Sequence, residues 1–184
     1  CSTGGKLLRE FCDEHGITYD MCGKLIVAID DDQVPRLKEL YRRGTANGAE
    51  GLEIISAERL KEFEPHVTGV RAIWSPNTGI IDYTEVSHAY ATKMREAGGD
   101  LLKGAQVTAM SRDGSDIRLD TTVGEISSRH VINCAGLHAD RVARMMGTDI
   151  GVRIIPFRGE YYSLRPERSH LIKGLIYPVP DPAL

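Results

Sequence analysis

The chain has 184 residues, of which 41% are hydrophobic and 27% are charged, the usage of an ordinary globular protein. Its 23 basic and 26 acidic side chains leave a formal net charge of −3, which argues against a nucleic-acid-binding surface. No apolar run reaches the roughly 20 residues that a membrane-spanning helix needs, so we expect no transmembrane segment.

The first part of the sequence alternates between predicted helices and strands. Apolar residues at three- and four-residue spacing predict helices over Ser2–His15, from Val34 to about Asn47, and over Ala57–Phe63. Short apolar runs predict buried strands at Lys24–Ile29, Leu52–Ile55 and Val70–Trp74. Asp30, Asp31 and Asp32 precede the second helix. Because no further oxygen ligands follow them at loop spacing, we interpret these aspartates as helix-capping residues and not as a metal site.

The middle of the chain predicts a longer helix followed by a β-meander. Asp82 is expected to cap this helix, with Glu85 three residues on in the capping-box position. The expected buried stripe of the helix is Val86, Ala89, Tyr90, Met94 and Ala97. A strand is predicted over Leu101–Ala109. A hairpin turn at Asp113-Gly114 and a second turn near Gly124 indicate that Gln106–Gly136 forms three antiparallel strands leading into a buried fourth.

The stretch Arg129–Gly147 is typical of a strand, a glycine turn and a helix. The apolar pair Val131-Ile132 is followed by a sharp turn at Ala135-Gly136 and then by a helical pattern that Gly147 ends. Small residues at the carboxyl end of a strand let a ligand approach the backbone, as in nucleotide-binding α/β sheets. The alternative is that the glycine serves only helix–strand packing, and the residues alone leave both interpretations open.

The motif PFRGEYY lies in a segment, Val152–Leu164, whose apolar alternation is interrupted by Pro156 and Gly159. This interruption predicts a bent or edge strand. Arg158 in this motif suits bidentate capture of a carboxylate. The alternative, a structural ion pair with Glu160 or another acid, has equal support from the sequence.

A second late motif, YPVPDP, begins at Tyr177 within Leu171–Pro182. The segment is predicted to begin as a strand and to end in prolines. Proline at alternate positions gives a stiff, extended backbone that suits the wall of a pocket and equally suits a linker.

Motifs of nucleophilic or metal-dependent catalysis are absent from the sequence. No GxSxG, HExxH or CxxC occurs, and the scattered histidines are interpreted as surface or packing residues. The four cysteines are Cys1, Cys12, Cys22 and Cys134. Because their spacing suggests neither a metal site nor a disulfide framework, we interpret them as reduced, mostly buried thiols of a cytoplasmic protein.

Five motifs in one register resemble a known family. They are FCDEHGITYDMCGKLIVA, PNTGIIDYTEV, VINCAGLHADRVARMMG, PFRGEYYSL and GLIYPVPDP. The sequence resembles the FAD-dependent L-2-hydroxyglutarate oxidases and dehydrogenases, which are D-amino-acid-oxidase-like flavoproteins, over essentially its whole length. The resemblance implies a mixed α/β fold: the central fragment of a two-domain FAD-dependent oxidoreductase, with a mixed-sheet substrate domain and a three-stranded antiparallel meander in the FAD-binding domain.

The resemblance also implies a division of the chain between two domains. Residues 1–18 and 83–148 are expected in the FAD-binding domain, and residues 19–82 and 149–184 in the substrate domain. In the family, the GxGxxG unit and a His-containing stretch against the flavin lie upstream of Cys1, and the closing FAD-binding strands lie downstream of Leu184. We therefore expect an internal fragment that folds by itself, but is inactive and retains no FAD.

Site residues follow from the resemblance position by position. Val107 matches the strand near the adenine, and Ala135 and Gly136 match the turn beside the nucleotide. Arg158 and Tyr177 match positions on the substrate side. The family's acid–base residues fall mostly outside this sequence, so the catalytic residues stay open, and no metal is implied.

The reaction implied is oxidation of the 2-hydroxyl of L-2-hydroxyglutarate, a small dicarboxylate 2-hydroxy acid, to 2-oxoglutarate by hydride transfer to FAD. The electrons then pass to oxygen, a quinone or another carrier. The expected location is the cytoplasm, with peripheral association at the inner membrane as an alternative, and the oligomeric state stays open. Two other interpretations are kept: a flavin oxidase of the same fold acting on an amine, an amino acid or glycerol 3-phosphate, and a non-catalytic structural module.

Overall fold

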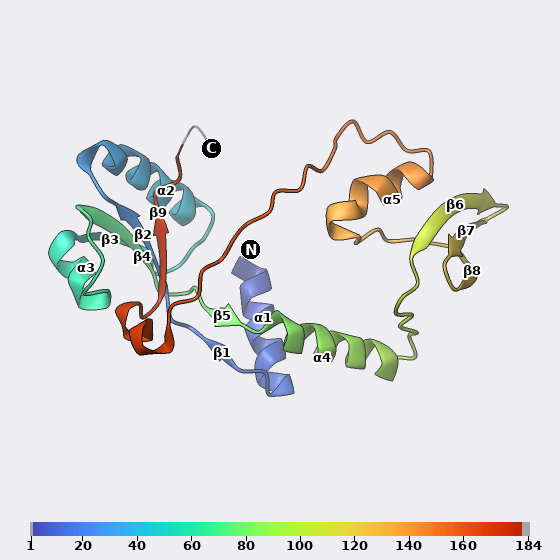
Figure 1. The fold of residues 1–184 in the computed structure, drawn as a ribbon, viewed down its shortest axis with the longest axis horizontal. Helices are drawn as coiled ribbons and strands as arrows, with labels where there is room; N and C mark the ends of the chain where they lie inside the picture. Colours follow the sequence, from blue (N-terminus) through green and yellow to red (C-terminus); the bar gives the residue numbers. More distant parts are fainter. Residues whose placement is uncertain (1, 182–184) are drawn as a thin grey trace. The chain divides into compact units, whose positions relative to one another are not determined.

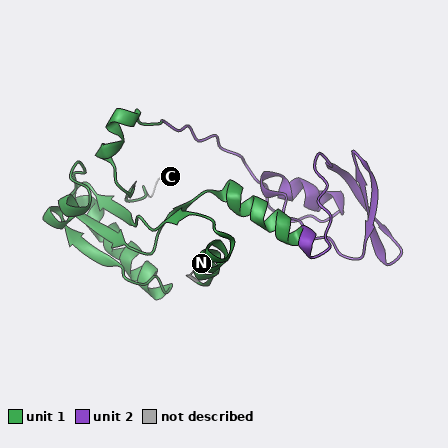
Figure 2. Ribbon diagram, turned by 90° about the horizontal axis from the view of Figure 1, so that it is seen from below, with its two compact units in different colours: residues 1–94, 163–184 green, residues 95–162 purple. Residues whose placement is uncertain are grey.

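Residues 2–181 are described by a computed structural model, in which the chain passes from one unit into a second and back. Unit 1 takes the chain up to Met94 and again from Ser163 onward, and unit 2 takes Arg95–Tyr162 (Figure 2). The two are described separately below.

A four-stranded mixed sheet forms the centre of unit 1. Its strands, in spatial order, are β3 (Glu53–Ser56), β4 (Arg71–Ser75), β2 (Lys24–Ala28) and β9 (Leu175–Pro178). The first three pair antiparallel, whereas β9 pairs parallel with β2 and places Tyr177 opposite Ile26. The sheet therefore joins segments from the two ends of the described chain.

Helices cover both faces of this sheet because its strands are apolar on both sides (Figure 1). Leu60 and Phe63 of α3 (Ala57–Phe63) pack with Leu25 and Val27 on one face. Side chains of α2 (Val34–Ala46), with Leu37 fully buried, pack on the other. The short 3-10 helices η1 (Asp31–Gln33) and η3 (Pro166–Leu171) precede α2 and β9.

A smaller cluster in unit 1 holds two helices around a two-residue ladder. The ladder pairs β1 (Tyr19–Asp20) with β5 (Ile80–Ile81). Cys12 of α1 (Ser2–His15) and Val86 of α4 (Tyr83–Glu96) are buried against it together with Ile17. This cluster fixes the position of α1 beside the sheet of unit 1.

Unit 2 consists of a β-meander, a turn, a short helix and an irregular segment. The meander contains β6 (Val107–Asp113), β7 (Asp116–Thr121) and β8 (Gly124–Ser128), all antiparallel. The 3-10 helix η2 (Gly136–His138) and α5 (Ala139–Met145) follow. The expected mixed α/β class with a three-stranded antiparallel meander is confirmed.

The helix-capping predictions for Asp30, Ser56 and Asp82 are confirmed by hydrogen bonds. The Asp30 side chain accepts a hydrogen bond from the Gln33 N–H at 3.1 Å, and Ser56 accepts one from Arg59 at 3.3 Å. Asp82 accepts one from the Thr84 N–H at 2.7 Å at the start of α4. The three aspartates therefore begin a helix, as the sequence indicates.

Two predicted strands are absent from the structure of residues 2–181. The run Val131-Ile132 belongs to no sheet, and Ile132 is exposed. The pair has no strand partner among the described residues, and the Asn133 side chain that follows bonds the backbone of the turn, at Ala135 and Ala139. The segment from Val152 to Leu164 is irregular and exposed, since Pro156 lacks a donor and side chains bond its early backbone groups.

Three smaller predictions also need correction. The strand predicted from Leu101 begins only at Val107, because Gly104 makes a turn at φ +70°. In the predicted stripe of α4, only Val86 is buried, and Tyr90 lies exposed with its ring stacked on Phe11 at 4.4 Å. Of the cysteines, Cys12 is buried, Cys22 is half-buried and Cys134 is exposed, all three as free thiols, while Cys1 lies outside the described residues.

No helix between residues 2 and 181 has the length and apolar character needed to cross a bilayer.

Candidate functional site

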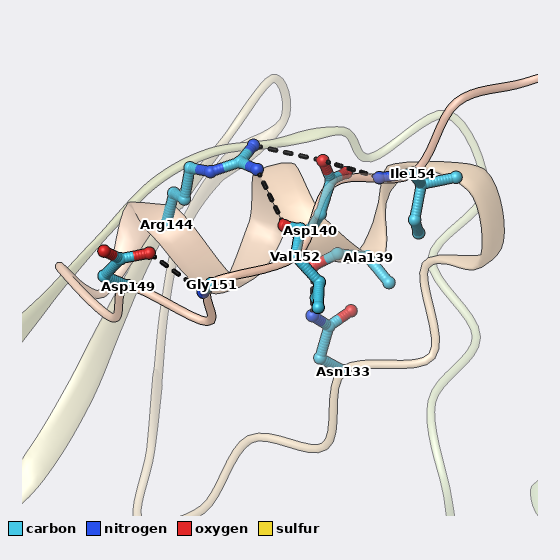
Figure 3. A network of polar contacts seen from close by, with 8 residues as sticks. All are labelled: Asn133, Ala139, Asp140, Arg144, Asp149, Gly151, Val152 and Ile154. Carbon is cyan, nitrogen blue, oxygen red and sulfur yellow. Dashed lines mark hydrogen bonds and ion pairs between the residues drawn. The ribbon is translucent and has the colours of Figure 1, made fainter.

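The turn between β8 and α5 is held in place by Asn133. The Asn133 Oδ1 accepts a hydrogen bond from the Ala135 N–H at 3.1 Å, and its Nδ2 donates to the Ala139 carbonyl at 2.8 Å. Figure 3 shows this side chain beneath the first turn of α5. The His138 N–H donates to the Ala135 carbonyl at 3.0 Å, which closes the turn from the other side.

Gly136 is required by the backbone of this turn and leaves free space beside it. Its φ is +54°, a conformation that costs a residue with a Cβ roughly 1–2 kcal/mol. A Cβ built at Gly136 meets no atom within 4 Å, so crowding is not the reason for glycine here. The turn thus offers accessible backbone next to open space.

Asp140 anchors the irregular segment that follows α5. Its side chain is 5% exposed, and its Oδ2 accepts hydrogen bonds from Arg144 Nη1 at 3.1 Å and from the Ile154 N–H at 3.4 Å (Figure 3). Arg144 also donates from Nη2 to the Val152 carbonyl at 3.2 Å. Two residues of α5 therefore hold the backbone of Val152 and Ile154.

The pKa of Asp140 reflects two opposing effects. Burial favours the neutral acid and would raise the pKa, but hydrogen bonds from the Ile154 N–H and from the Arg144 guanidinium favour the carboxylate. The net result is a pKa below the ordinary value for aspartate. A polar cavity of about 460 Å³ lies beside this network, with Arg141, Arg144 and Arg153 in its wall.

The three predicted cofactor-binding residues all belong to unit 2. Val107 is the first residue of β6 and pairs with Thr121 at a point where the ladder changes register. Ala135 and Gly136 lie exposed in the turn that leads into α5, which runs beside β6. Their contact with a nucleotide stays a prediction.

The two predicted substrate-binding residues belong to different units. Arg158 lies on the irregular segment of unit 2, is 87% exposed and forms an ion pair with Glu160 at 3.7 Å. Tyr177 lies on β9 of unit 1 and is half exposed, with Lys24 Nζ at 5.6 Å from the centre of its ring. Neither substrate role is tested by these contacts.

The sequence interpretation did not single out Asn133, Asp140 or Lys24. The spacing of Asp140 and Arg144, four residues apart at the start of a helix, is a recognisable ion-pair signal. Lys24 meets Tyr177 only through the pairing of β2 with β9, which no local pattern indicates.

Known proteins are similar to this chain in sequence and in fold. The sequence model of the family "DAO: FAD dependent oxidoreductase" matches residues 1–184. L-2-hydroxyglutarate dehydrogenases are similar at 43% identity in Nematostella vectensis, 43% in Homo sapiens and 40% in Escherichia coli K12, over 98% to 100% of this chain. The animal proteins are named as mitochondrial. The chain spans only 42% to 44% of the lengths of these three relatives.

Solved structures give the same fold at lower identity. L-proline dehydrogenase from P. horikoshii superposes with a TM-score of 0.78 at 22% identity, covering 96% of this chain and 48% of that one. Glycine oxidase from Geobacillus kaustophilus superposes with a TM-score of 0.73 at 20% identity, covering 94% and 47%. An FAD-bound L-α-glycerophosphate oxidase from Mycoplasma pneumoniae gives 0.72 at 20%, covering 89% and 44%. The resemblance noted from the motifs is thus confirmed, and the chain belongs to the DAO family of FAD-dependent oxidoreductases.

Proposed function

We propose that this chain is part of an enzyme that oxidises the 2-hydroxyl of L-2-hydroxyglutarate to 2-oxoglutarate with FAD. The observation that carries the proposal is the identity of 40% to 43% with proteins named L-2-hydroxyglutarate dehydrogenase, from animals and a bacterium, over nearly every residue of the chain. The chain covers less than half of each relative, so the activity is proposed for a protein that contains it.

The turn at Ala135-Gly136 has the features that a nucleotide-binding position needs. Its backbone is exposed, and the hydrogen bonds of the Asn133 side chain hold it in place. The space where a Cβ of Gly136 would lie is open. These features support Ala135 and Gly136 as residues that approach FAD, with Val107 on the neighbouring strand. FAD, when bound, supplies the two-electron acceptor for the reaction.

A dicarboxylate substrate requires cationic and hydrogen-bonding partners from the protein. Arg158 offers a planar guanidinium with only one long ion pair, to Glu160, in the described part of the chain. Tyr177 offers a half-exposed phenol ring on β9, which pairs with β2. We assign Arg158 to a substrate carboxylate and Tyr177 to the wall of the substrate pocket.

The domain assignment belongs to the same proposal. Residues 1–18 and 83–148 are assigned to the FAD-binding domain, and residues 19–82 and 149–184 to the substrate domain. The two units of Figure 2 have other boundaries, after Met94 and before Ser163, because they are compact parts of the fold. The domains are defined by the ligand that each one is proposed to bind.

A substrate profile tests this function. A purified protein that contains this chain is assayed with L-2-hydroxyglutarate, D-2-hydroxyglutarate, sarcosine, glycine and glycerol 3-phosphate, once with oxygen and once with a quinone acceptor. We expect kcat/KM for L-2-hydroxyglutarate to exceed the others by roughly 100-fold, the discrimination that about 3 kcal/mol of differential binding gives. A preference for sarcosine, glycine or glycerol 3-phosphate would instead assign the protein to another oxidase of the same fold.

A further inference from the structure

We propose that a cationic cavity in unit 1 binds a small dianionic oxyanion, a group that carries phosphate or carboxylate oxygens. The cavity has a volume of about 310 Å³, and its charged and hydroxyl-bearing walls are Lys6, Arg9, Lys24, Glu50, Ser75 and Thr78, with Asn77 beside them. These residues come from α1, from the start of β2, from the turn before β3, from the end of β4 and from the turn after β4.

The charges around the cavity favour an anion. Lys6, Arg9 and Lys24 face a single carboxylate, Glu50, which Lys6 Nζ contacts at 3.4 Å. Neither Arg9 nor Lys24 forms an ion pair with another residue in the described part of the chain, and both are half-buried. Partly buried cations without a counter-ion gain more from an anion than fully solvated ones, because water screens them less.

The cavity also contains hydroxyl and amide donors. Ser75 Oγ and Thr78 Oγ1 lie 3.1 Å apart, so one hydroxyl donates to the other and the second hydroxyl keeps its proton for a ligand. Asn77 Nδ2 donates one hydrogen to the Glu50 carbonyl at 3.0 Å and has a second hydrogen to offer. The cluster therefore offers two cations, Arg9 and Lys24, and two neutral donors. An oxyanion can accept hydrogen bonds from all of them at once.

These donors are held in place before any ligand arrives. Lys24 lies opposite Ser75 in the antiparallel ladder of β2 and β4. The Gly23 N–H donates to the Thr78 carbonyl at 2.8 Å, which fixes the turn after β4. The ring of Tyr177 lies near the ammonium group of Lys24, with its centre 5.6 Å from Nζ. A site arranged in advance loses less conformational entropy when the ligand binds.

This inference does not rest on the proposed oxidation. The cavity residues belong to unit 1, as does Tyr177 beside Lys24, whereas the turn at Gly136 and Arg158 belong to unit 2. Binding of a dicarboxylate would mean that the cavity takes a ligand of the same class as the proposed substrate. Binding of phosphate would mean that it takes a ligand of a different class.

Calorimetric titration of the purified protein tests the site. Inorganic phosphate and 2-oxoglutarate are the two probes, with chloride at equal ionic strength as the reference. We expect saturable binding of at least one probe. Lys24→Gln and Arg9→Gln should each weaken it by about ten-fold or more, the effect of losing one charged hydrogen bond. Lys24→Arg, which keeps the charge, should retain most of the affinity.

The matched control is Lys38→Gln, which removes an exposed lysine of α2 outside the cavity and should leave binding unchanged. Binding of phosphate alone, of 2-oxoglutarate alone or of both supports the site and identifies the chemistry of its ligand. Absence of binding by both probes, or affinities that Lys24→Gln and Lys38→Gln lower equally, would overturn the inference. Melting curves of all variants without a probe show whether each one is folded.

Discussion

Two charged side chains of unit 2 differ in their access to solvent. Arg158 is almost fully exposed, and exposed ion pairs such as its contact with Glu160 contribute little to stability because water and side-chain entropy oppose them. Asp140 is almost fully buried and carries hydrogen bonds from α5 and from the following segment. Enzyme kinetics are therefore the better test of the role of Arg158. A measurement of local stability is the better test of the role of Asp140.

Arg158→Lys keeps the positive charge but removes the planar fork. If Arg158 binds a substrate carboxylate, kcat/KM for L-2-hydroxyglutarate should fall by roughly ten-fold or more, since a charged hydrogen bond contributes about 1.5–3 kcal/mol. Steady-state kinetics of the enzyme that contains this chain measure the effect, with Arg165→Lys as the control on the same exposed stretch. An unchanged kcat/KM would leave the ion pair with Glu160 as the interpretation of this residue.

We expect the contact between Asp140 and the Ile154 N–H in unit 2 to be sensitive to acid. Its pKa in the folded protein lies below the ordinary value, so its stabilising effect is complete above that ordinary value, about 3.9. The effect is lost as the pH falls through the lower, folded-state pKa. Amide hydrogen exchange at Ile154 should therefore accelerate, relative to the intrinsic rate, only below about pH 4.

Asp140→Asn should show the faster exchange at Ile154 already at neutral pH, because the amide cannot replace the charged contact with Arg144. Asp149→Asn, a change at an exposed carboxylate that accepts only the nearby Gly151 N–H in Figure 3, is the control. Equal exchange in the two variants would contradict the anchoring role of Asp140.

At the scale of the elements, Glu64 holds the residues before β9, a strand that also pairs with β2. It is 2% exposed, and its carboxylate accepts hydrogen bonds from the N–H groups of Lys173 at 3.0 Å and of Gly174 at 2.7 Å. These bonds join the end of α3 to the residues directly before β9, which carries Tyr177. A buried carboxylate with two backbone donors thus links the end of α3 to the start of the last strand.

Glu64→Gln should destabilise unit 1 by about 1–3 kcal/mol, because it removes the negative charge and replaces Oε2, which accepts from the Lys173 N–H at 3.2 Å, by an amide nitrogen that cannot accept. Urea unfolding followed by the fluorescence of Trp74, which lines the same pocket as Glu64, measures the change. Glu53→Gln, at an exposed carboxylate on β3, should have no comparable effect. Equal unfolding midpoints for the two variants would contradict the stabilising role of Glu64.

Gly136→Val tests whether the turn before α5 approaches FAD. Gly147 is a matched control, because its φ is +71° and a Cβ built there also meets no atom within 4 Å. Backbone strain should lower the melting temperature of both apo-proteins by a similar amount. Only Gly136→Val should weaken FAD retention, measured by flavin release from the enzyme that contains this chain. Equal flavin retention in the two variants would favour a role of Gly136 in the backbone alone.

Local elements were predictable from the sequence because their determinants lie close together in the chain. The bounds of α1 and α3 and the capping by Asp30, Ser56 and Asp82 follow from residues within one helical turn. The apolar pair Val131-Ile132 also suggested a strand, but a strand exists only when it pairs, and pairing is not a local property.

Candidate-site residues were predictable only in part, for the same reason. The turn at Gly136 is visible in the sequence, as is the Asp140–Arg144 spacing that went unused. The contacts of Glu64 with Lys173 and of Lys24 with Tyr177 join distant segments and follow from the topology of the sheet alone.

At the scale of the whole molecule, the 184-residue chain expressed alone should be colourless. No GxGxxG loop occurs in it, and in dinucleotide-binding folds the backbone of that loop holds the pyrophosphate. Loss of three charge-assisted hydrogen bonds, at roughly 1.5–3 kcal/mol each, weakens binding by about a thousand-fold or more. Visible absorbance and titration with FAD measure retention. A yellow preparation with stoichiometric flavin would show that these residues suffice for FAD binding.

The parallel pairing of β2 with β9 has a consequence for biosynthesis. Lys24 lies opposite Leu175, a residue that the ribosome adds roughly 150 positions later, which takes about 10–30 s at ordinary elongation rates. During that interval β2 has an open edge with Leu25 and Val27, while the hairpins of unit 2 can form within microseconds of emerging. The nascent chain therefore completes its second unit before its first, and during that interval the open edge of β2 is accessible to chaperones that bind exposed strands.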